Sequence, residues 1–266
     1  MPRARLAPSW RPGAWKMRKV ILPLLAFTLM IFLWRFLVEL YEIPKFILPM
    51  PEAVAASFWE NFGSLMAALL ETLRVTFTAL AGAIASGVLL ALLFSLSRSF
   101  EMTVYPFAVV LQVTPIVSVA PLVLIWVGID HVDRALVIIA WLAAFFPILA
   151  NMSAGLRSVD RHLDDLFTLY GASRWQRFWR LSWPTALPYL LASLKVSGGL
   201  ALIGAVVAEF VAGSGGATGL AWRILEAGNR LQVEKMFAGL LLLSLAGVAI
   251  FYSFSVLEWA VMRKRR

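Results

Sequence analysis

Four stretches of this sequence contain no Asp, Glu, Lys or Arg, and each is long enough to cross a membrane as a helix. They are 23, 28, 22 and 22 residues long and cover residues 75–97, 102–129, 135–156 and 236–257. A helix rises about 1.5 Å per residue, so about 20 apolar residues cross the roughly 30 Å hydrocarbon core of a bilayer. The sequence therefore predicts an all-α, polytopic integral membrane protein.

Two further apolar runs carry a few charges. Residues 20–40 contain Arg35 and Glu39 near one end, where long side chains can snorkel to the interface. Residues 189–212 are interrupted by Lys195 and Glu209. We therefore expect about six transmembrane helices, which we place at about 20–40, 75–97, 104–128, 135–156, 189–212 and 236–257.

The chain is expected to consist of a short N-terminal segment and one domain. Residues 1–19 form a basic segment, and residues 20–266 are expected to form one transmembrane domain. A basic segment before an apolar run is also typical of a secretory signal, but this run is longer than the 7 to 15 residues of a signal core, and no small-residue cleavage pattern follows promptly.

Composition excludes a soluble fold and argues against nucleic acid. Hydrophobic residues make up 61% of the 266 residues, charged residues 15%, and the mean hydropathy is +0.82, whereas soluble domains contain about 25% charged residues. The net charge is +9, but the basic residues lie at the ends and in short loops, where anionic lipid headgroups meet them. The sequence contains no cysteine, so it has no disulfide and no thiolate metal site.

The distribution of basic residues predicts the orientation. Lys and Arg in short loops are retained on the cytoplasmic side. With the N-terminus inside, sixteen basic residues lie in inner segments and six in outer ones. Both termini are therefore expected to be cytoplasmic, which requires an even number of spans. We expect a multi-pass membrane protein.

Two loops are longer than simple connections need. The outer loop, 41–74, contains three prolines followed by residues 52–71, which could form a helix that lies on the membrane surface. In the inner loop, 157–187, apolar residues recur with the period of one helical face, and Gly171 follows as a C-terminal cap. These residues are Leu163, Leu166, Phe167 and Tyr170.

A second short helix is expected directly after Gly171. Ser173 and Gln176 have the spacing of a capping box, and Arg174, with two further arginines at three-residue steps, forms a basic edge. Pro184 and Pro188 are expected to break this helix before the next span. We call residues 157–187 the knuckle. The alternatives for it are a stiff element that transmits a push and an amphipathic hairpin that rests on lipid.

The knuckle resembles the cytoplasmic EAA loop of the permease subunits of binding-protein-dependent ABC importers. Asp165, Gly171, Leu181 and Pro184 stand at the family's spacing, while Leu166 and Phe167 replace its two alanines and Trp183 replaces the leucine before the proline. The resemblance covers roughly residues 48–257 and is closest to the nitrate, sulfonate and taurine branch. The segments that carry the branch resemblance are 48–51, 120–128, 145–148 and 207–209.

This resemblance implies a type I (MetI-like) permease core that is not itself an enzyme. It implies a homodimer with two P-loop ATPase subunits and an extracytoplasmic solute-binding protein, and no cofactor except the ATP bound by the partners. The coupling contacts would come from the loop around Gly171. Its expected residues are Asp165, Leu166, Phe167, Gly171, Ala172, Ser173, Arg174, Leu181 and Pro184.

Three residues are candidates for the transport pathway. Pro115 and Pro121 fall inside the third expected span, where each removes a backbone hydrogen bond, and irregular helices often border pathways. A structural kink explains them equally well. Glu209 follows Ala201 and Ala205 at four-residue steps, so it lies near a seam of small residues. We hypothesise that it lines or gates the outer end of the pathway, with an interhelical hydrogen bond as the alternative.

Catalytic signatures are missing from the sequence. There is no Gly-Lys pair, hence no P-loop, so the energy for transport comes from a partner or an ion gradient. Asp130, His131 and Asp133 form a polar turn that we do not read as a metal site. The alternative function is an ion-coupled secondary transporter or channel of six helices, for which more intramembrane carboxylates and an internal repeat are expected.

Overall fold

The computed structural model describes residues 12–213 and 218–263; for residues 12–20 and 129 it describes the backbone alone. Within these residues the chain is helical and contains no strand. The elements in chain order are α1 (Pro12–Leu40), α2 (Pro51–Glu60), α3 (Phe62–Leu96), α4 (Arg98–Val113), α5 (Ile116–Val127), the 3-10 helix η1 (Ile129–His131), α6 (Val132–Arg157), α7 (Arg161–Leu169), α8 (Arg174–Arg177), the π-helix η2 (Phe178–Ser182), α9 (Trp183–Ala212), α10 (Leu220–Asn229) and α11 (Val233–Arg263).

Five helical segments are long and apolar enough to cross a membrane. They are α1 from Ile21 onward, α3, α6, the continuous segment Arg174–Ala212, and α11. The pair α4 and α5 would make a sixth span if the two helices are counted together. The described residues thus contain five or six candidate spans, consistent with the expected polytopic fold.

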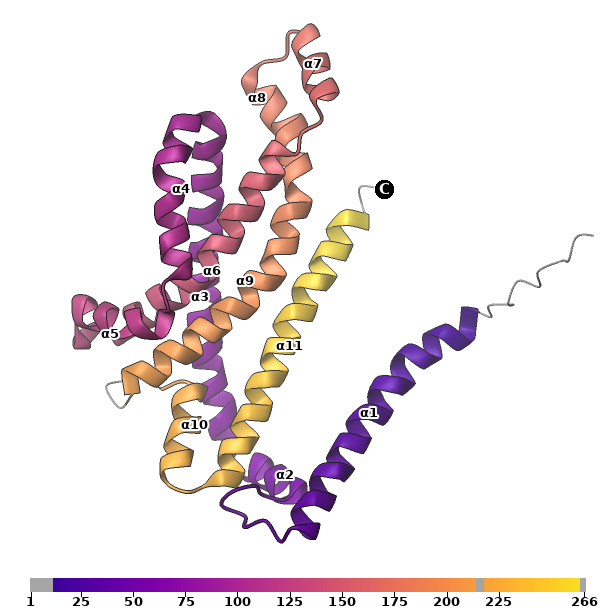
Figure 1. Ribbon diagram of the computed structural model, residues 1–266, viewed down its shortest axis with the longest axis vertical. Helices are drawn as coiled ribbons and strands as arrows, with labels where there is room; N and C mark the ends of the chain where they lie inside the picture. Colours follow the sequence, from indigo (N-terminus) through magenta and orange to yellow (C-terminus); the bar gives the residue numbers. More distant parts are fainter. Residues whose placement is uncertain (1–11, 214–217, 264–266) are drawn as a thin grey trace, which may run out of the picture.

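The third expected span, 104–128, is not one helix. Helices α4 and α5 meet at 104°, and α5 lies across the direction of the bundle (Figure 1). The reason is local. Thr114 and Pro115 both have extended backbones, with ψ of 125° and 118°, because the residue before a proline is disfavoured in the helical region and the proline has no N–H to continue the ladder.

Helix α3 begins earlier than charge alone predicts. It starts at Phe62 and runs through Glu71 and Arg74, so the expected surface helix at 52–71 is instead the short α2 followed by the first turns of α3. Both charged side chains are exposed on α3. A charged residue at the end of an apolar stretch indicates where the hydrocarbon ends. It does not indicate where the helix ends, because a helix can continue into the interface or into water.

The core is the close packing of α3, α6 and α9. Ala79, Ala140 and Ala205, one from each helix, form a fully buried cluster. Gly87 of α3 faces α6 so closely that an added Cβ would lie 3.0 Å from Ile148. Small residues let helix backbones approach closely. The small-residue series of α3 is therefore a packing seam; its members are Ala79, Ala83, Gly87 and Ala91.

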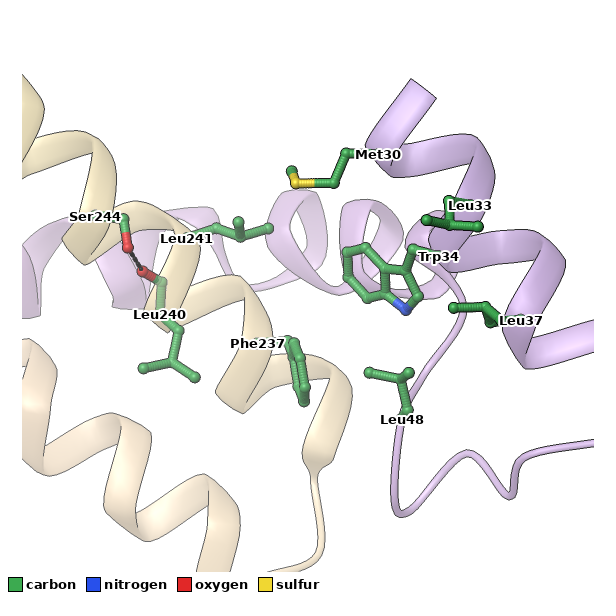
Figure 2. A pocket seen from close by; sticks show the side chains of 9 residues that line it. All are labelled: Met30, Leu33, Trp34, Leu37, Leu48, Phe237, Leu240, Leu241 and Ser244. Carbon is green, nitrogen blue, oxygen red and sulfur yellow. Dashed lines mark hydrogen bonds between the residues drawn. The ribbon is translucent and has the colours of Figure 1, made fainter. Parts of the chain in front are cut away.

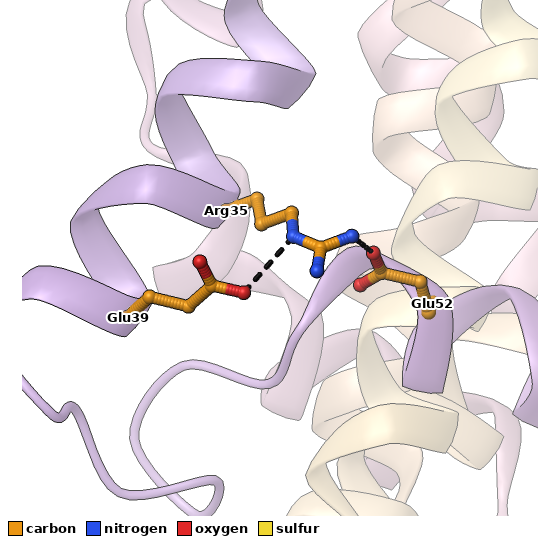
Figure 3. A network of polar contacts seen from close by, with 3 residues as sticks. All are labelled: Arg35, Glu39 and Glu52. Atoms are coloured by element: carbon orange, nitrogen blue, oxygen red, sulfur yellow. Dashed lines mark hydrogen bonds and ion pairs between the residues drawn. The ribbon is translucent and has the colours of Figure 1, made fainter.

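Helix α1 leans away from this core (Figure 1). Trp34 packs against Phe237 of α11, with ring centroids 6.0 Å apart, and the two helices border an open apolar groove of about 490 Å³ (Figure 2). Arg35 pairs with Glu39 at 3.0 Å and with Glu52 of α2 (Figure 3). The described part of α1 is thus connected to the rest through the end that leads into α2.

Candidate functional site

Helix α7 forms the tip of the knuckle and of the whole molecule (Figure 1). Its N-terminus is capped by Asp160, whose carboxylate accepts the N–H of His162 at 2.8 Å. None of its residues is buried, and Leu169 is 84% exposed. Asp165 and Leu166 are exposed, and Phe167 is half-buried. An amphipathic helix with its apolar side open to the surroundings lacks a partner surface.

The turn after α7 is fixed by backbone geometry. Gly171 has a φ of +66°, which an L-residue with a side chain adopts only with strain. The N–H of Ala172 donates to the carbonyl of Phe167 at 3.0 Å and that of Gly171 to Thr168 at 3.0 Å, in the pattern of a helix C-cap. Asp164 of α7 pairs with Arg177 of α8 at 3.4 Å. These contacts hold the two short helices in one arrangement.

The predicted capping box at the start of α8 is present. Ser173 Oγ accepts the N–H of Gln176 at 3.3 Å, and Gln176 Oε1 accepts the N–H of Ser173 at 2.9 Å. Arg174 follows as the first helical residue and is exposed. The second half of the knuckle therefore begins at a defined residue.

The break expected at Pro184 and Pro188 is wrong. Helix α8, the π-helix η2 and helix α9 follow one another without interruption from Arg174 to Ala212. In the π-turn the N–H of Trp183 donates to the carbonyl of Phe178. A proline ring clashes with the carbonyl four residues earlier in a regular helix, and a wider π-turn directly before Pro184 changes that register. Leu181, within η2, is buried.

Glu209 lies at the far end of α9 and is only 1% exposed. Its Oε1 accepts the hydroxyl of Thr72 at 2.7 Å, and its Oε2 accepts the N–H of Ala221 at 2.8 Å and of Trp222 at 3.4 Å. The N–H of Leu220 donates to Thr72 Oγ1 at 2.8 Å. The carboxyl group therefore joins α3, α9 and the N-terminus of α10, where unpaired N–H groups favour such a partner.

Gly219 completes this network by its lack of a side chain. A Cβ at this position would lie 2.0 Å from Oε1 of Glu209. The geometry is that of the interhelical hydrogen bond that was the alternative to a gate. A role of Glu209 in the pathway stays a prediction.

The other two pathway candidates lie on α5. Pro115 is the residue before its first turn, at the 104° bend, and Pro121 lies inside the helix with an exposed side chain. Asp130 and His131 belong to η1. Within the described residues, no three His, Asp or Glu side chains are arranged to hold a metal ion.

Lys195 has a partner that the sequence did not reveal. It forms an ion pair with Glu258 of α11, and both side chains are about one quarter exposed. Lys195 and Glu258 belong to different helices, and no pattern within either helix indicates the pairing. Two charges that neutralise each other between helices reduce the cost of placing either in a span.

We expect reversal of either charge alone, Lys195→Glu or Glu258→Lys, to lower the melting temperature of the detergent-purified protein. Exposed pairs contribute up to about 1 kcal/mol, and the apolar surroundings of this pair lead us to expect at least about that loss, or roughly 2 to 4 °C. The double reversal should restore most of it. Two additive losses in the double variant would contradict the pairing.

Several cavities contain charged groups from different helices, and two of these cavities border α6. One, of about 390 Å³ between α3 and α6, is lined by Glu71, Arg74, Asp133 and Arg134 together with apolar side chains. A smaller one, of about 260 Å³, lies where Arg157 of α6 pairs with Glu101 of α4. Each contains both acidic and basic groups, so neither favours a cationic or an anionic ligand.

The partners of Glu209 are the main residues that sequence reasoning missed. Thr72 and Thr76 are fully buried on the same side of α3 as Ala79 and Ala83. Thr72 and Thr76 continue the series of small residues toward the start of α3. The expected span began at residue 75, so Thr72 was not included in it. Helix α10 was missed because it lies within a segment that was treated as a connection between spans.

The profile of the family described as "binding-protein-dependent transport system inner membrane component" matches residues 80–263. The riboflavin transport system permease protein of Chloroflexus aurantiacus is 32% identical over 244 residues, covering 91% of this chain and 89% of its own length. The formylaminopyrimidine transport permease protein of Halalkalibacterium halodurans is 31% identical over 237 residues, covering 89% and 92%. Proteins named as permeases for aliphatic sulfonates, taurine and nitrate also match.

A solved structure of an amino acid ABC transporter shares the fold. It superposes with a TM-score of 0.64 over 79% of this chain and 97% of that chain, at 16% identity. The resemblance drawn from the knuckle and from segments such as 120–128 is thus confirmed at the level of family and branch.

Proposed function

Because this chain belongs to the family of inner membrane components of binding-protein-dependent transport systems, we propose that it works as one half of the membrane pathway of an ATP-driven importer. It is a permease subunit, and the curated relatives bear names of transport permease proteins or ABC transporter permease proteins. The alternative of an ion-coupled transporter or channel finds no support among them. ATP binding and hydrolysis are assigned to separate partner subunits.

The proposed complex contains two copies of this chain, two ATPase subunits and a solute-binding protein on the opposite face. In this arrangement the knuckle and both termini are cytoplasmic, in a bacterial inner membrane. The end of α11 and the knuckle lie toward the same side of the bundle (Figure 1). This placement agrees with the excess of sixteen basic residues over six in the segments assigned to the inside.

The open apolar side of α7 is the observation that carries the ATPase assignment. Leu166, Leu169 and Tyr170 project from a helix that is capped, braced by the Asp164–Arg177 pair, and not packed on its own protein. A short rigid helix with exposed leucine and tyrosine fits a hydrophobic groove in a partner protein. We assign this role of the knuckle to α7, with Asp165, Leu166 and Phe167 in the contact.

The helix behind the knuckle supplies a route for movement. Residues 174–212 form one continuous helix, and α9 packs along α6 and α3 in the core. At its other end Glu209 binds the first turn of α10. A displacement of α7 by ATP-driven closure of the ATPase pair would therefore reach the opposite side of the bundle along a single element, as alternating access requires.

Leu166→Asp is expected to weaken binding of the ATPase subunit and to abolish most ATP-dependent uptake. Truncating or charging a central interface residue costs about 2 kcal/mol or more, which is roughly a thirtyfold rise in Kd. The matched control is Thr168→Asp, which places the same charge on the opposite side of the same helix. Binding is measured with purified ATPase, and uptake in vesicles that contain the complete transporter. Equal effects of both variants would refute the assignment.

The substrate proposed is a small solute of the kind named for the relatives, either a nitrate-, sulfonate- or taurine-like anion or a pyrimidine-type vitamin precursor. Those names extend from nitrate to riboflavin, so similarity among permeases does not fix the solute. Specificity is assigned to the solute-binding protein. A thermal-shift screen of that protein against these solutes, followed by uptake of the best one through the complete transporter, tests this assignment.

A further inference from the structure

Four aromatic side chains form a continuous cluster at the base of the knuckle. We call Trp175, Phe178, Trp179 and Trp183 the aromatic ladder. Neighbouring rings lie 5.3 to 6.2 Å apart between centroids, in tilted or edge-on contact. Phe178 and Trp183 pack against the core, whereas Trp175 is 69% and Trp179 is 48% exposed. The ladder thus leads from the packed bundle to an open surface.

The ladder lies at the start of a helix that is long and apolar enough to span a membrane. The helix 174–212 has 39 residues, and about 20 suffice to cross the hydrocarbon core. Arg180 is the last charged residue before an uncharged stretch, residues 181–194, so the part that crosses the hydrocarbon is expected to begin next to the ladder. Figure 1 shows α8 between the bundle and α7, with α7 farther out. Tryptophan is enriched at this depth because one part of its ring is apolar and its N–H needs a polar partner.

The charges around the ladder are positive. Arg174 and Arg180 are exposed on the same segment, and in the described part of the chain neither has an ion-pair partner, in contrast to Arg177, which binds Asp164. Guanidinium groups bind phosphate oxygens in a bidentate manner. Helix α7 differs, since it has no tryptophan and carries Asp164 and Asp165.

We propose that the aromatic ladder anchors the knuckle in the lipid headgroup region. Trp175 and Trp179 insert into the interface on the knuckle's side of the membrane, and Arg174 and Arg180 bind the phosphates of anionic lipids. Helix α7 alone then remains in water for a protein partner. The sequence left two alternatives for the knuckle, a stiff element that transmits a push and a hairpin that rests on lipid. In this proposal α7 has the first role, and the segment that carries the aromatic ladder has the second.

The absence of cysteine from the sequence makes a direct test simple. Single cysteines are introduced as Trp175→Cys and Trp179→Cys, with Leu169→Cys and Tyr170→Cys on α7 as matched exposed controls. Each full-length variant is spin-labelled and reconstituted, without ATPase, into vesicles of phosphatidylethanolamine and phosphatidylglycerol. Collision rates with oxygen, which concentrates in the membrane, and with a water-soluble nickel chelate report the depth of each label.

Labels at 175 and 179 are expected to favour oxygen, and labels at 169 and 170 the nickel chelate. Adding Arg174→Gln and Arg180→Gln should move the label at 179 toward water in these vesicles and leave it unchanged in purely zwitterionic ones. Nickel-accessible labels at all four positions would overturn the proposal. It would also be overturned if 175 and 179 become shielded from both reagents only when the ATPase is added, because the ladder would then dock on protein. These readouts do not depend on transport.

Discussion

Replacing Gly204 with valine is expected to be among the most damaging single changes in this protein. Gly204 lies where α9 crosses α6, and an added Cβ would lie 2.7 Å from the Cα of Ala140 and 3.0 Å from the Cβ of Ala143. The first of these atoms belongs to backbone, which moves only with the whole helix. Overpacking of this kind costs about 3 kcal/mol or more when the surroundings cannot yield.

Gly199→Val provides a matched control on the same helix. Nothing lies within 4 Å of a Cβ at position 199, so both variants change helix propensity alike and differ only in contact. We expect the detergent-solubilised Gly204→Val protein to be mostly aggregated or to melt far below the Gly199→Val protein. Equal elution profiles and equal melting temperatures for the two variants would contradict the close approach of α6 and α9 at Gly204.

The second large effect is expected at the Glu209 network. In Glu209→Ala the N–H groups of Ala221 and Trp222 and the hydroxyl of Thr72 lose their acceptor in a buried place. A buried donor left without an acceptor costs about 1 to 3 kcal/mol. We expect a loss of about 3 kcal/mol or more, seen as a lower melting temperature and faster proteolysis near α10.

Thr72→Val removes one hydroxyl from the same network at nearly constant volume. Thr76→Val is its control, because Thr76 is also fully buried but its hydroxyl donates only within its own helix, to the carbonyl of Thr72. Thr72→Val should destabilise clearly more than Thr76→Val, and its effect should be smaller in a Glu209→Ala background. Additive effects would mean that Thr72 and Glu209 do not interact.

Glu209→Gln distinguishes the structural role from the proposed gate. The amide oxygen can keep accepting from α10, and the hydroxyl of Thr72 can rotate toward the carbonyl of Ala68, which lies 3.3 Å away. A purely structural Glu209 therefore predicts nearly normal stability and uptake for this variant. Normal stability with impaired uptake would support a role in the pathway, and unchanged uptake would reject it.

The fold was largely predictable because charge is expensive in hydrocarbon. That single rule located both ends of α6 and the start of α11 within three residues, whereas α11 continues to Arg263, beyond the expected end at 257. It failed at residues 104–128, where an uncharged stretch contains a 104° bend, since absence of charge indicates an apolar environment and says nothing of direction. The dipeptide Thr114-Pro115 was the local signal for the bend.

The candidate site was predictable where local chemistry decides the structure. The capping box at Ser173 and Gln176 and the left-handed Gly171 follow from short-range spacing alone. Contacts between distant segments were not predictable from one sequence. Thr72 and Glu209 are 137 residues apart, and no periodicity within either helix indicates the other. Pro184 was misread because the accommodating π-turn precedes it and has no simple sequence signature.

The π-turn at Phe178–Ser182 helps to determine the direction in which α7 and α8 point relative to α9. Each residue in a regular helix advances the side chains by about 100°, so a wider turn gives the segments on either side of η2 different angular phases. The side of the α9 axis toward which Trp175 and α7 point is therefore determined by η2 as well as by the core packing of α9. In an assembly of two such subunits, that phase would fix where each ATPase must stand relative to the symmetry axis.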